Sequence, residues 1–380
     1  MRKKILIVFG TRPEAIKMAP LVKQFKQNTD EFEVGVCVTA QHREMLDQIL
    51  DFFEIKPDFD LNLMRKGQDL FSLTSDVLCG LKSILLEFSP NYVFVHGDTT
   101  TSTFAALASY YHGAKVCHVE AGLRTFNKYS PFPEEMNRQL TGRIADYHFA
   151  PTEISEQNLL VENVKDESIV VTGNTVIDAL IWADEKLNNY QDSELDSLKK
   201  IIHPERKIIL VTGHRRENFG EGFLNICAAI KEIAVKNSDV DIIYPVHLNP
   251  NVQRPVYDIL ENIQNVHLIS PLGYPTFVWL MKKSYLILTD SGGVQEEAPS
   301  LGKPVLVMRD TTERPEAVKA GTVILVGTDK RVIVDECQSL LTNVERYTEM
   351  SLLHNPYGDG LAAKRIVEFI KKLNEPSLNF

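Results

Sequence analysis

The sequence predicts an α/β protein of two domains, each with a parallel β-sheet covered by helices on both faces. Two observations lead to this fold class. The chain has 380 residues, a length that suggests two domains of ordinary size. Short apolar runs alternate with amphipathic stretches along most of the chain, which is the order of strands and helices in parallel sheets.

In the first half, strands and helices are expected to alternate. The expected strands are Ile5–Phe9, Glu33–Thr39, Tyr92–His96, Lys115–Val119 and Tyr147–Ala150. The helices expected between them include Ala15–Gln27, Gln41–Phe52, Leu70–Phe88 and Thr101–Tyr111. Ligands of open α/β sheets bind beyond the carboxyl ends of the strands, so the residues that follow each strand are the candidates for a site.

A polar segment, Ile181–Arg206, precedes a second alternating series. The strands expected there are Lys207–Thr212, Val240–Val246, Val266–Ile269, Tyr285–Thr289, Pro304–Val307 and Thr322–Leu325. Both halves open with a strand, a Gly-containing loop that carries an Arg, and a helix. We place the boundary near residue 170, which gives domains at residues 1–170 and 171–360, and a last helix, Leu361–Leu373, that would finish the second domain.

Composition excludes some partners and compartments. The formal charge is −10, from 41 Lys and Arg against 51 Asp and Glu, which argues against a general binder of nucleic acid or anionic membranes. No stretch approaches the roughly 20 apolar residues that span a bilayer, and the first apolar run, Ile5–Phe9, is too short for a signal peptide. Isolated cysteines without a CxxC pair fit a reducing compartment, so the cytoplasm is expected.

Missing motifs exclude some enzyme classes. No GxGxxG follows the first strand, and neither GxxxxGK[ST] nor HExxH occurs. These absences weigh against a nicotinamide dehydrogenase, a P-loop enzyme and a zinc hydrolase. We therefore expect neither a cofactor nor a catalytic metal.

Charged and polar residues collect at the strand ends of the first half. The first strand is followed by Gly10–Glu14, with Lys17 one turn into the helix. Later strands end in His96-Gly97-Asp98 and in Glu120–Arg124, and a loop with Glu134 comes next. Parallel strands would bring these groups to one rim.

The second half has its own set. Its strands end in Gly213–Glu217, in His247 and in Asp290–Gly293, and the last of these opens a helix. Exposed N–H groups at a helix start attract phosphate, and Gly lets the backbone come close to it.

Each motif alone has a plain structural alternative. Asp98 could be an N-cap, since Asp satisfies free helix N–H groups, and His214 could be a structural histidine. The neighbours Glu134 and Glu135 could be solvated, and Arg12 and Lys17 could form surface ion pairs. Their co-location at the strand ends of two similar halves favours a shared function.

A family resemblance rests on motifs spread over nearly the whole chain, in order. They are Phe9–Ala15, His96–Thr100, His118–Arg124, Pro133–Glu135, Gly213–Glu217, Thr289–Ser300 and Arg309–Pro315. Together they closely resemble the bacterial non-hydrolysing UDP-N-acetylglucosamine 2-epimerases.

The resemblance implies a fold and a reaction. The fold would be of the glycosyltransferase-B type, with two Rossmann-like domains facing across a cleft and residues 361–380 packing back on the first domain, which revises the role given above to the last helix. The reaction would be reversible inversion at C2, between UDP-N-acetylglucosamine and UDP-N-acetylmannosamine, through elimination of UDP to 2-acetamidoglucal. It needs no nicotinamide, and it would serve bacterial surface polysaccharide synthesis in a homodimeric enzyme.

The resemblance also implies residue roles. Proton transfer would fall to Asp98, Glu120 and Glu134. His214 would stabilise or protonate the leaving diphosphate, with Arg12 and Lys17 as electrostatic partners. The phosphates of the substrate would lie on the turn Ser291, Gly292 and Gly293. Glu297 would bind the ribose, Arg314 would contact the substrate, and Phe277 would pack near the uracil.

Many members of this family also bind a second UDP-N-acetylglucosamine as an activator. The matching region includes Gln41, Arg215 and His247. Two positions depart from the activator pattern, because Glu44 stands where Gln is common and Gly67 where Arg is common. An added carboxylate and a lost cation both disfavour a diphosphate, so weakened or absent activation is expected.

Three alternatives remain at this point. A glycosyltransferase of the same fold would need an acceptor, and a hydrolysing epimerase would release free N-acetylmannosamine. A catalytically silent UDP-sugar sensor would have no chemical reason to retain three carboxylates together with His214.

Overall fold

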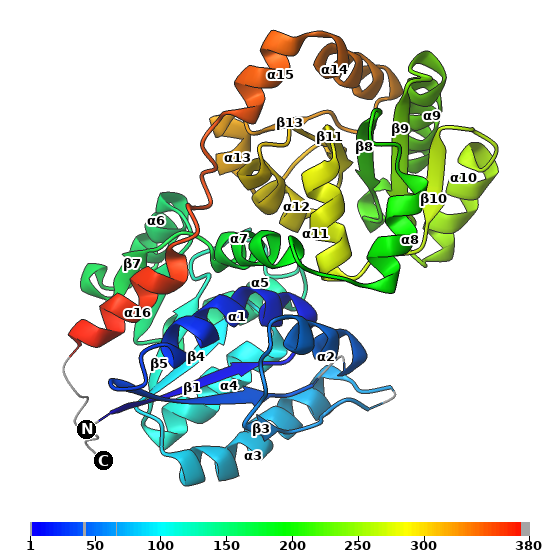
Figure 1. Cartoon of the computed structure of the whole chain (residues 1–380). Coiled ribbons are helices and arrows are strands. Elements are labelled where there is room, and N and C mark those ends of the chain that lie inside the picture. Colours follow the sequence, from blue (N-terminus) through cyan, green and yellow to red (C-terminus); the bar gives the residue numbers. More distant parts are fainter. Residues whose placement is uncertain (1, 41–42, 66, 374–380) are drawn as a thin grey trace. The chain divides into compact units, whose positions relative to one another are not determined.

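A computed structural model of the chain describes residues 2–40, 43–65 and 67–373 (Figure 1). The chain divides into two compact units. The first holds the chain up to Trp182 together with a returning segment from Tyr357, and the second holds Ala183–Pro356. Each unit contains one sheet in which all pairs of neighbouring strands are parallel, so the predicted fold of two parallel-sheet α/β domains is confirmed.

The first unit has a seven-stranded sheet in the order β3-β2-β1-β4-β5-β6-β7. Its strands are β1 (Lys3–Phe9), β2 (Phe32–Val38), β3 (Phe59–Asp60), β4 (Tyr92–His96), β5 (Lys115–Val119), β6 (Tyr147–Ala150) and β7 (Ile169–Val171). The order reverses between β1 and β4, which makes this point a topological switch point, the position at which open α/β sheets usually bind ligands.

Helices cover both faces of this sheet. They are α1 (Arg12–Lys26), α2 (Arg43–Phe52), α3 (Leu70–Phe88), α4 (Thr100–His112), α5 (Glu134–Ile144), α6 (Glu153–Val161), α7 (Thr175–Leu187) and α16 (Ala362–Lys372). On one face α3 and α4 bury apolar side chains such as Leu81 and Ala105 against Val93 and Val95 of β4. Phe25 of α1 packs edge-on against Phe94 of the same strand, with ring centroids 5.2 Å apart.

The last helix, α16, belongs to the first unit. It packs against α1, and its Phe369 lies edge-on to Phe149 of β6, with ring centroids 5.7 Å apart. Both of its ends are fixed by hydrogen bonds. Asp178 of α7 accepts the backbone N–H groups of Ala362 and Ala363 at 3.2 and 2.8 Å, and Lys3 Nζ donates to carbonyls of the last turn.

The second unit has a six-stranded sheet in the order β10-β9-β8-β11-β12-β13. Its strands are β8 (Lys207–Thr212), β9 (Val240–Pro245), β10 (Val266–Ile269), β11 (Leu286–Thr289), β12 (Val305–Val307) and β13 (Val323–Leu325). The order reverses between β8 and β11, so this unit has a switch point of the same kind.

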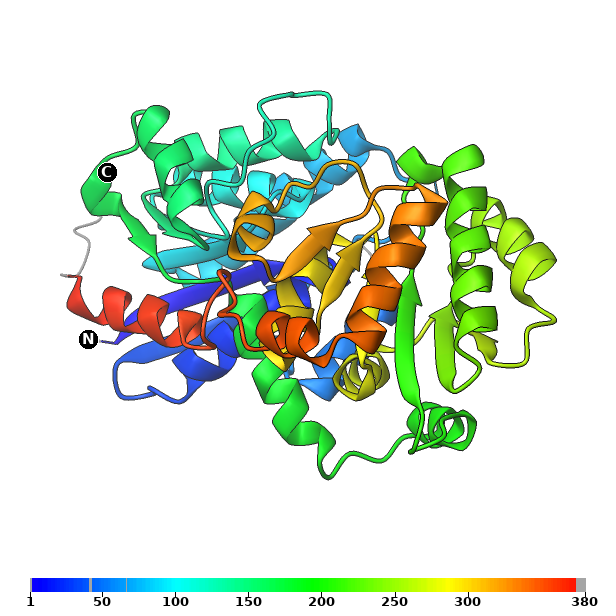
Figure 2. The ribbon, with the colours of Figure 1, turned by 90° about the horizontal axis from the view of Figure 1, so that it is seen from above.

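The helices of the second unit are α8 (Ser193–Ile201), α9 (Glu221–Lys236), α10 (Pro250–Leu260), α11 (Tyr274–Lys283), α12 (Gly292–Glu297), α13 (Pro315–Ala320), α14 (Lys330–Thr342) and α15 (Val344–Ser351). Of these, α14 packs beside α9 (Figure 2), and both bury apolar side chains against β8, β9 and β11. Within the described residues, no helix is long and apolar enough to cross a membrane.

Asp178 provides a test of how α16 is held. Asp178→Ala removes the acceptor for two N–H groups at the start of the helix, so we expect the free energy of unfolding to fall by about 1–3 kcal/mol, measured by urea denaturation. Burial raises the pKa of Asp178 to about 6 from its ordinary value of 3.8. A carboxyl whose pKa is higher in the folded than in the unfolded chain stabilises the fold fully below its unfolded pKa. This stabilisation is lost as pH rises through the folded pKa.

The loss in Asp178→Ala should therefore be larger at pH 4 than at pH 7. Glu368 of α16 serves as the control, because it pairs with Lys364 at 4.0 Å with both side chains more than half exposed. Glu368→Ala should change stability by less than about 0.5 kcal/mol. An equal loss in the two variants would contradict the helix-holding role of Asp178.

Candidate active site

Glu14 ties together the two turns at the switch point of the first sheet. Its side chain is buried, with 1% exposed. Oε2 accepts the N–H groups of Gly10 and Thr11 at 3.1 and 2.8 Å, in the turn after β1. Oε1 accepts the hydroxyls of Thr99 and Ser102 at 2.6 and 2.9 Å, at the start of α4 after β4. The turns that carry Arg12 and Asp98 are thereby fixed to each other.

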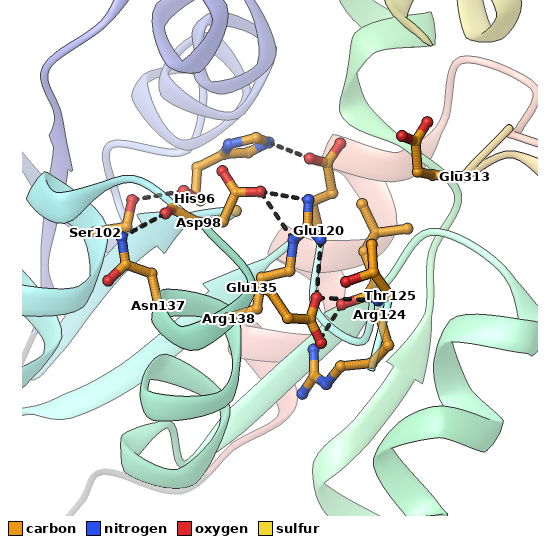
Figure 3. Close-up of polar contacts among 12 residues, drawn as sticks. His96, Asp98, Ser102, Glu120, Arg124, Thr125, Glu135, Asn137, Arg138 and Glu313 are labelled. Atoms are coloured by element: carbon orange, nitrogen blue, oxygen red, sulfur yellow. Dashed lines mark hydrogen bonds and ion pairs between the residues drawn. The ribbon is translucent and has the colours of Figure 1, made fainter. Parts of the chain in front are cut away.

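Asp98 follows β4 and is held from α5 (Figure 3). Arg138 donates Nε–H to Asp98 Oδ2 at 2.8 Å, and its Nη2 lies 2.7 Å from the same oxygen. Asn137 Nδ2 donates to the Asp98 carbonyl at 2.9 Å. The other side of Arg138 is fixed by Glu135, whose Oε2 accepts Nη1–H at 3.1 Å. Arg138 therefore fixes the carboxylate of Asp98, and Asn137 fixes its backbone.

Burial raises the pKa of Asp98 above the ordinary aspartate value. The negative charge of Glu120 raises it further, while Arg138 and Lys17 lower it. Because these effects oppose one another, small changes around the site can alter the protonation of Asp98. A raised pKa brings a carboxyl closer to the range in which it can both accept and donate a proton.

Glu120 comes directly after β5 in a left-handed backbone conformation, with φ of 60°. Its Oε2 accepts hydrogen bonds from Lys17 Nζ and, at 2.7 Å, from Asn174 Nδ2. Its Oε1 lies 3.8 Å from His96 Nε2. Lys17, expected beside a diphosphate, thus forms an ion pair with Glu120 in this structure. A non-Gly residue with positive φ is uncommon and often marks a functional position.

Glu134 and Glu135 begin α5 and differ in their surroundings. Glu135 is fully buried, and its oxygens accept backbone N–H groups of Thr125 and Phe126 at 3.0 and 3.1 Å, so the alternative of a solvated pair is wrong for this residue. Glu134 Oε2 is also buried, but it has no hydrogen-bond partner among the described residues. Buried acceptors are nearly always paired, so this oxygen has the capacity to accept a hydrogen bond from another group.

Two further histidines lie beneath this rim. His118 Nε2 donates to the Gly97 carbonyl at 2.8 Å. Burial lowers the pKa of His118 to about 3 and that of His148 to about 4. Both rings are therefore neutral at physiological pH, and they support the loops as packed side chains.

In the second unit, Asp290 joins the two turns at the switch point. The residue is fully buried, and its Oδ2 accepts the N–H groups of His214 and Arg215, both at 2.8 Å. The His214 side chain is 43% exposed and its ring stacks on that of His247, with centroids 5.1 Å apart and 12° between the planes. The turn after β8 therefore presents an imidazole to solvent.

The phosphate turn predicted at Ser291–Gly293 lies at the start of α12. The Ser291 side chain makes no capping hydrogen bond to this helix. Glu296 Oε1 accepts Nε–H of Arg314 at 2.9 Å and lies 2.8 Å from its Nη2. This pair holds the guanidinium directly over Gly292. A cation and backbone N–H groups at a helix start are what a diphosphate requires.

The remaining predicted substrate residues also belong to the second unit. Glu297 is buried at the end of α12, and Phe277 is half-buried in α11.

The predicted activator positions are divided between the units. Gln41 lies outside the described residues. Glu44 in α2 and Gly67 are exposed in the first unit, whereas Arg215 and the exposed His247 belong to the second. Gly67 has φ of 75°, a conformation that a residue with a side chain would adopt only with strain.

Sequence reasoning assigned no role to Arg138, and it placed Glu14 and Asp290 in candidate strand-end segments without giving either a role. The spacing of Glu134 and Arg138, four residues apart on a predicted helix, places both on one face and could have indicated Arg138. The spacing of Thr11 and Glu14 matches a capping box, but nothing local shows that Glu14 also accepts the hydroxyls of Thr99 and Ser102. Likewise, nothing local shows that Asp290 accepts the N–H groups of His214 and Arg215.

Comparison with known proteins gives a consistent family. Residues 23–371 match the family model described as UDP-N-acetylglucosamine 2-epimerase. The chain is 58% identical over 377 residues to the UDP-N-acetylglucosamine 2-epimerase of Campylobacter jejuni, covering 98% of both chains. It is 60% identical over 370 residues to that of Escherichia coli K12, covering 97% of this chain and 98% of the relative.

A solved structure supports the same family. The UDP-GlcNAc 2-epimerase from Neisseria meningitidis, bound to UDP-GlcNAc, shares 52% sequence identity at a TM-score of 0.89, over 97% of this chain and 100% of that one.

The packing of Arg314 on Gly292 gives a matched pair of variants. A Cβ added at Gly292 would lie 2.7 Å from Arg314 Cζ, whereas one added at Gly293 would meet no atom closer than 3.9 Å. Gly292→Ala must displace an arginine held by the buried Glu296, so we expect a loss of about 1–3 kcal/mol in unfolding free energy. Gly293→Ala should cost less, and equal unfolding midpoints would show that Arg314 does not need this close approach.

Proposed function

The chain belongs to the UDP-N-acetylglucosamine 2-epimerase family, and from this we propose that it inverts C2 of the sugar reversibly, between UDP-N-acetylglucosamine and UDP-N-acetylmannosamine, without hydrolysis. The observation that carries the proposal is the cluster in the first unit. There Asp98 and Glu120 lie close enough to influence each other's charge, and each is paired with a cation.

The reaction proceeds by elimination and re-addition. A carboxylate takes the proton from C2 while the C1–O bond to UDP breaks, which leaves a C1–C2 double bond in 2-acetamidoglucal and both bonding electrons on UDP. A second acid then delivers a proton to the opposite face of C2, and a β-phosphate oxygen of UDP bonds to C1 again. The C2 hydrogen is not acidic by itself, so the step needs a positioned base and acid.

The carboxylates of the first unit supply these groups. Asp98 has a raised pKa and opposing neighbours, which suits a group that both accepts and donates a proton. Glu134 has a buried oxygen that no described residue satisfies, which suits an atom whose partner is the substrate. Glu120, paired with Lys17, is the third carboxylate of the set.

The second unit supplies the groups for UDP. Ser291 and the N–H groups at the start of α12 bind phosphate, Arg314 adds a positive charge, and His214 stabilises the leaving diphosphate. The buried Glu297 accepts hydrogen bonds from the ribose, and Phe277 packs near the uracil. Use of the product for bacterial surface polysaccharides, as the resemblance implies, is part of this proposal.

Proton NMR of UDP-N-acetylglucosamine with the protein in D₂O tests the reaction. We expect deuterium at C2 and the appearance of UDP-N-acetylmannosamine with no added acceptor. Free N-acetylmannosamine and UDP would instead indicate a hydrolysing enzyme. Turnover that requires an added acceptor would indicate a glycosyltransferase.

The division of roles predicts two kinds of variant. Asp98→Asn, Glu120→Gln and Glu134→Gln should each lower kcat by about 10²–10⁴-fold and leave UDP affinity unchanged, as measured by calorimetry. Ser291→Ala should instead weaken UDP binding as its main effect and change kcat little. Near-normal turnover in all three carboxylate variants, or an unchanged Kd in Ser291→Ala, would contradict the assigned roles.

The departures at Glu44 and Gly67 predict the loss or weakening of activation. With UDP-N-acetylmannosamine as substrate, the initial rate should rise hyperbolically with concentration and need no added UDP-N-acetylglucosamine. Strict dependence on the added sugar would show that a diphosphate is bound despite the acidic side chain and the missing cation.

A further inference from the structure

We propose that Asp290 is a positioning residue for His214. It fixes the turn that carries the imidazole and keeps the ring proton on Nδ1, so that Nε2 is the atom that exchanges a proton with the ligand. The inference rests on the proposed function, in which His214 acts on the departing diphosphate. It identifies Asp290 as the residue that orients this histidine.

One oxygen of Asp290 holds the backbone. Oδ2 accepts the N–H groups of His214 and Arg215, both at 2.8 Å, and the side-chain amide of Asn218 at 3.3 Å. The N–H of Asp290 donates to the Thr212 carbonyl at the end of β8 at 3.1 Å. These bonds define the path of the chain on both sides of His214, so the Cα of this residue has little freedom.

The other oxygen of Asp290 faces the imidazole. Oδ1 is buried and makes no hydrogen bond within the described part of the chain, and it lies 3.7 Å from His214 Nδ1. This distance is too long for a hydrogen bond, and it suits an electrostatic contact. A carboxylate oxygen only accepts, so it favours the ring form in which Nδ1 carries the proton. Nε2 is then the nitrogen left to accept or deliver a proton.

The charges around His214 work against one another. Burial lowers the pKa of its imidazole below the ordinary histidine value. The Asp290 carboxylate raises this pKa, while His247, stacked on the ring, and the adjacent Arg215 lower it. Of these neighbours, only Asp290 favours the imidazolium that would form when His214 takes up a proton.

Asp290→Asn tests the positioning role with little change of shape. The new amide must direct its oxygen at the two backbone N–H groups, so its NH₂ faces Nδ1 and favours the opposite tautomer. We expect kcat to fall between about 10- and 10⁴-fold, unchanged UDP affinity, and a lower pKa of His214 in ¹⁵N-histidine NMR. Unchanged kcat together with an unchanged His214 titration would overturn the proposal.

A double mutant separates action through His214 from a general structural effect. If Asp290 acts through this ring, Asp290→Asn added to His214→Asn should lower kcat no further than His214→Asn alone. Losses that multiply would show that Asp290 acts in another way.

Asp241→Asn is the matched control. Asp241 is equally buried in the same unit and binds Arg206 and His203 at 2.6 and 3.0 Å at the start of β9. It should leave kcat and the His214 titration unchanged even if it lowers stability. A shift of the His214 titration in this variant as large as in Asp290→Asn would show that any buried carboxylate of the unit has the same effect, and would overturn the proposal.

The wild-type protein gives a second test that does not depend on how a variant folds. The ¹⁵N signals of His214 can be assigned because they disappear in His214→Asn. Their shifts should show that the neutral imidazole is protonated on Nδ1. Rings protonated on Nε2 would overturn the proposal. This measurement needs no turnover. It therefore tests the role of Asp290 separately from the epimerase reaction, which the D₂O experiment tests.

Discussion

Two buried carboxylates hold together the loops on which the candidate site is built. In each unit the strand order reverses between central neighbours, β1 and β4 in the first unit and β8 and β11 in the second. The chain leaves such a pair of strands toward opposite faces of the sheet, so the backbone ladder does not hold the two loops together. Glu14 in the first unit and Asp290 in the second supply the missing connection by accepting hydrogen bonds across the switch point.

The hydrogen bonds that each buried carboxylate accepts distinguish the structural carboxylates from those that can take part in chemistry. Burying an ionised carboxylate is costly unless hydrogen bonds replace the lost water. Glu14 and Glu135 each accept hydrogen bonds at both oxygens, so they are fixed parts of the scaffold. Glu134 and Asp290 each keep one buried oxygen without a hydrogen bond inside the described ranges. These oxygens can respond to a ligand or to a neighbouring ring.

Sequence patterns predicted the longer elements well and the short or distant ones poorly. The expected strands at Ile5–Phe9, Lys115–Val119 and Lys207–Thr212 are present because continuous apolar runs of this length are buried on both faces. The edge strands β3 and β7, with two and three residues, are too short to show a pattern. The two compact units divide within the continuous helix α7, between Trp182 and Ala183, close to the start of the polar segment Ile181–Arg206.

The candidate site could likewise be predicted only in part from the sequence. Parallel topology was sufficient to predict that Asp98 and Glu120 would come together, because both follow neighbouring strands. The partners that set their charge could not be predicted, since Arg138 reaches Asp98 from a helix and Asn174 reaches Glu120 from beyond β7. A pairing of this kind depends on side-chain direction, which neither periodicity nor spacing records.

The backbone at Glu120 shows why strand-end position alone does not define the site. An extended residue at this point would direct its side chain along the alternation of β5, whereas the left-handed conformation at φ of 60° redirects it. That conformation costs on the order of 1 kcal/mol for a residue with a Cβ. Lys17 and Asn174 both donate to the redirected carboxylate, and charge-assisted hydrogen bonds of this kind exceed that cost. The cation that pairs with Glu120 therefore also offsets the cost of its backbone conformation, so the direction of this side chain depends on Lys17 and Asn174.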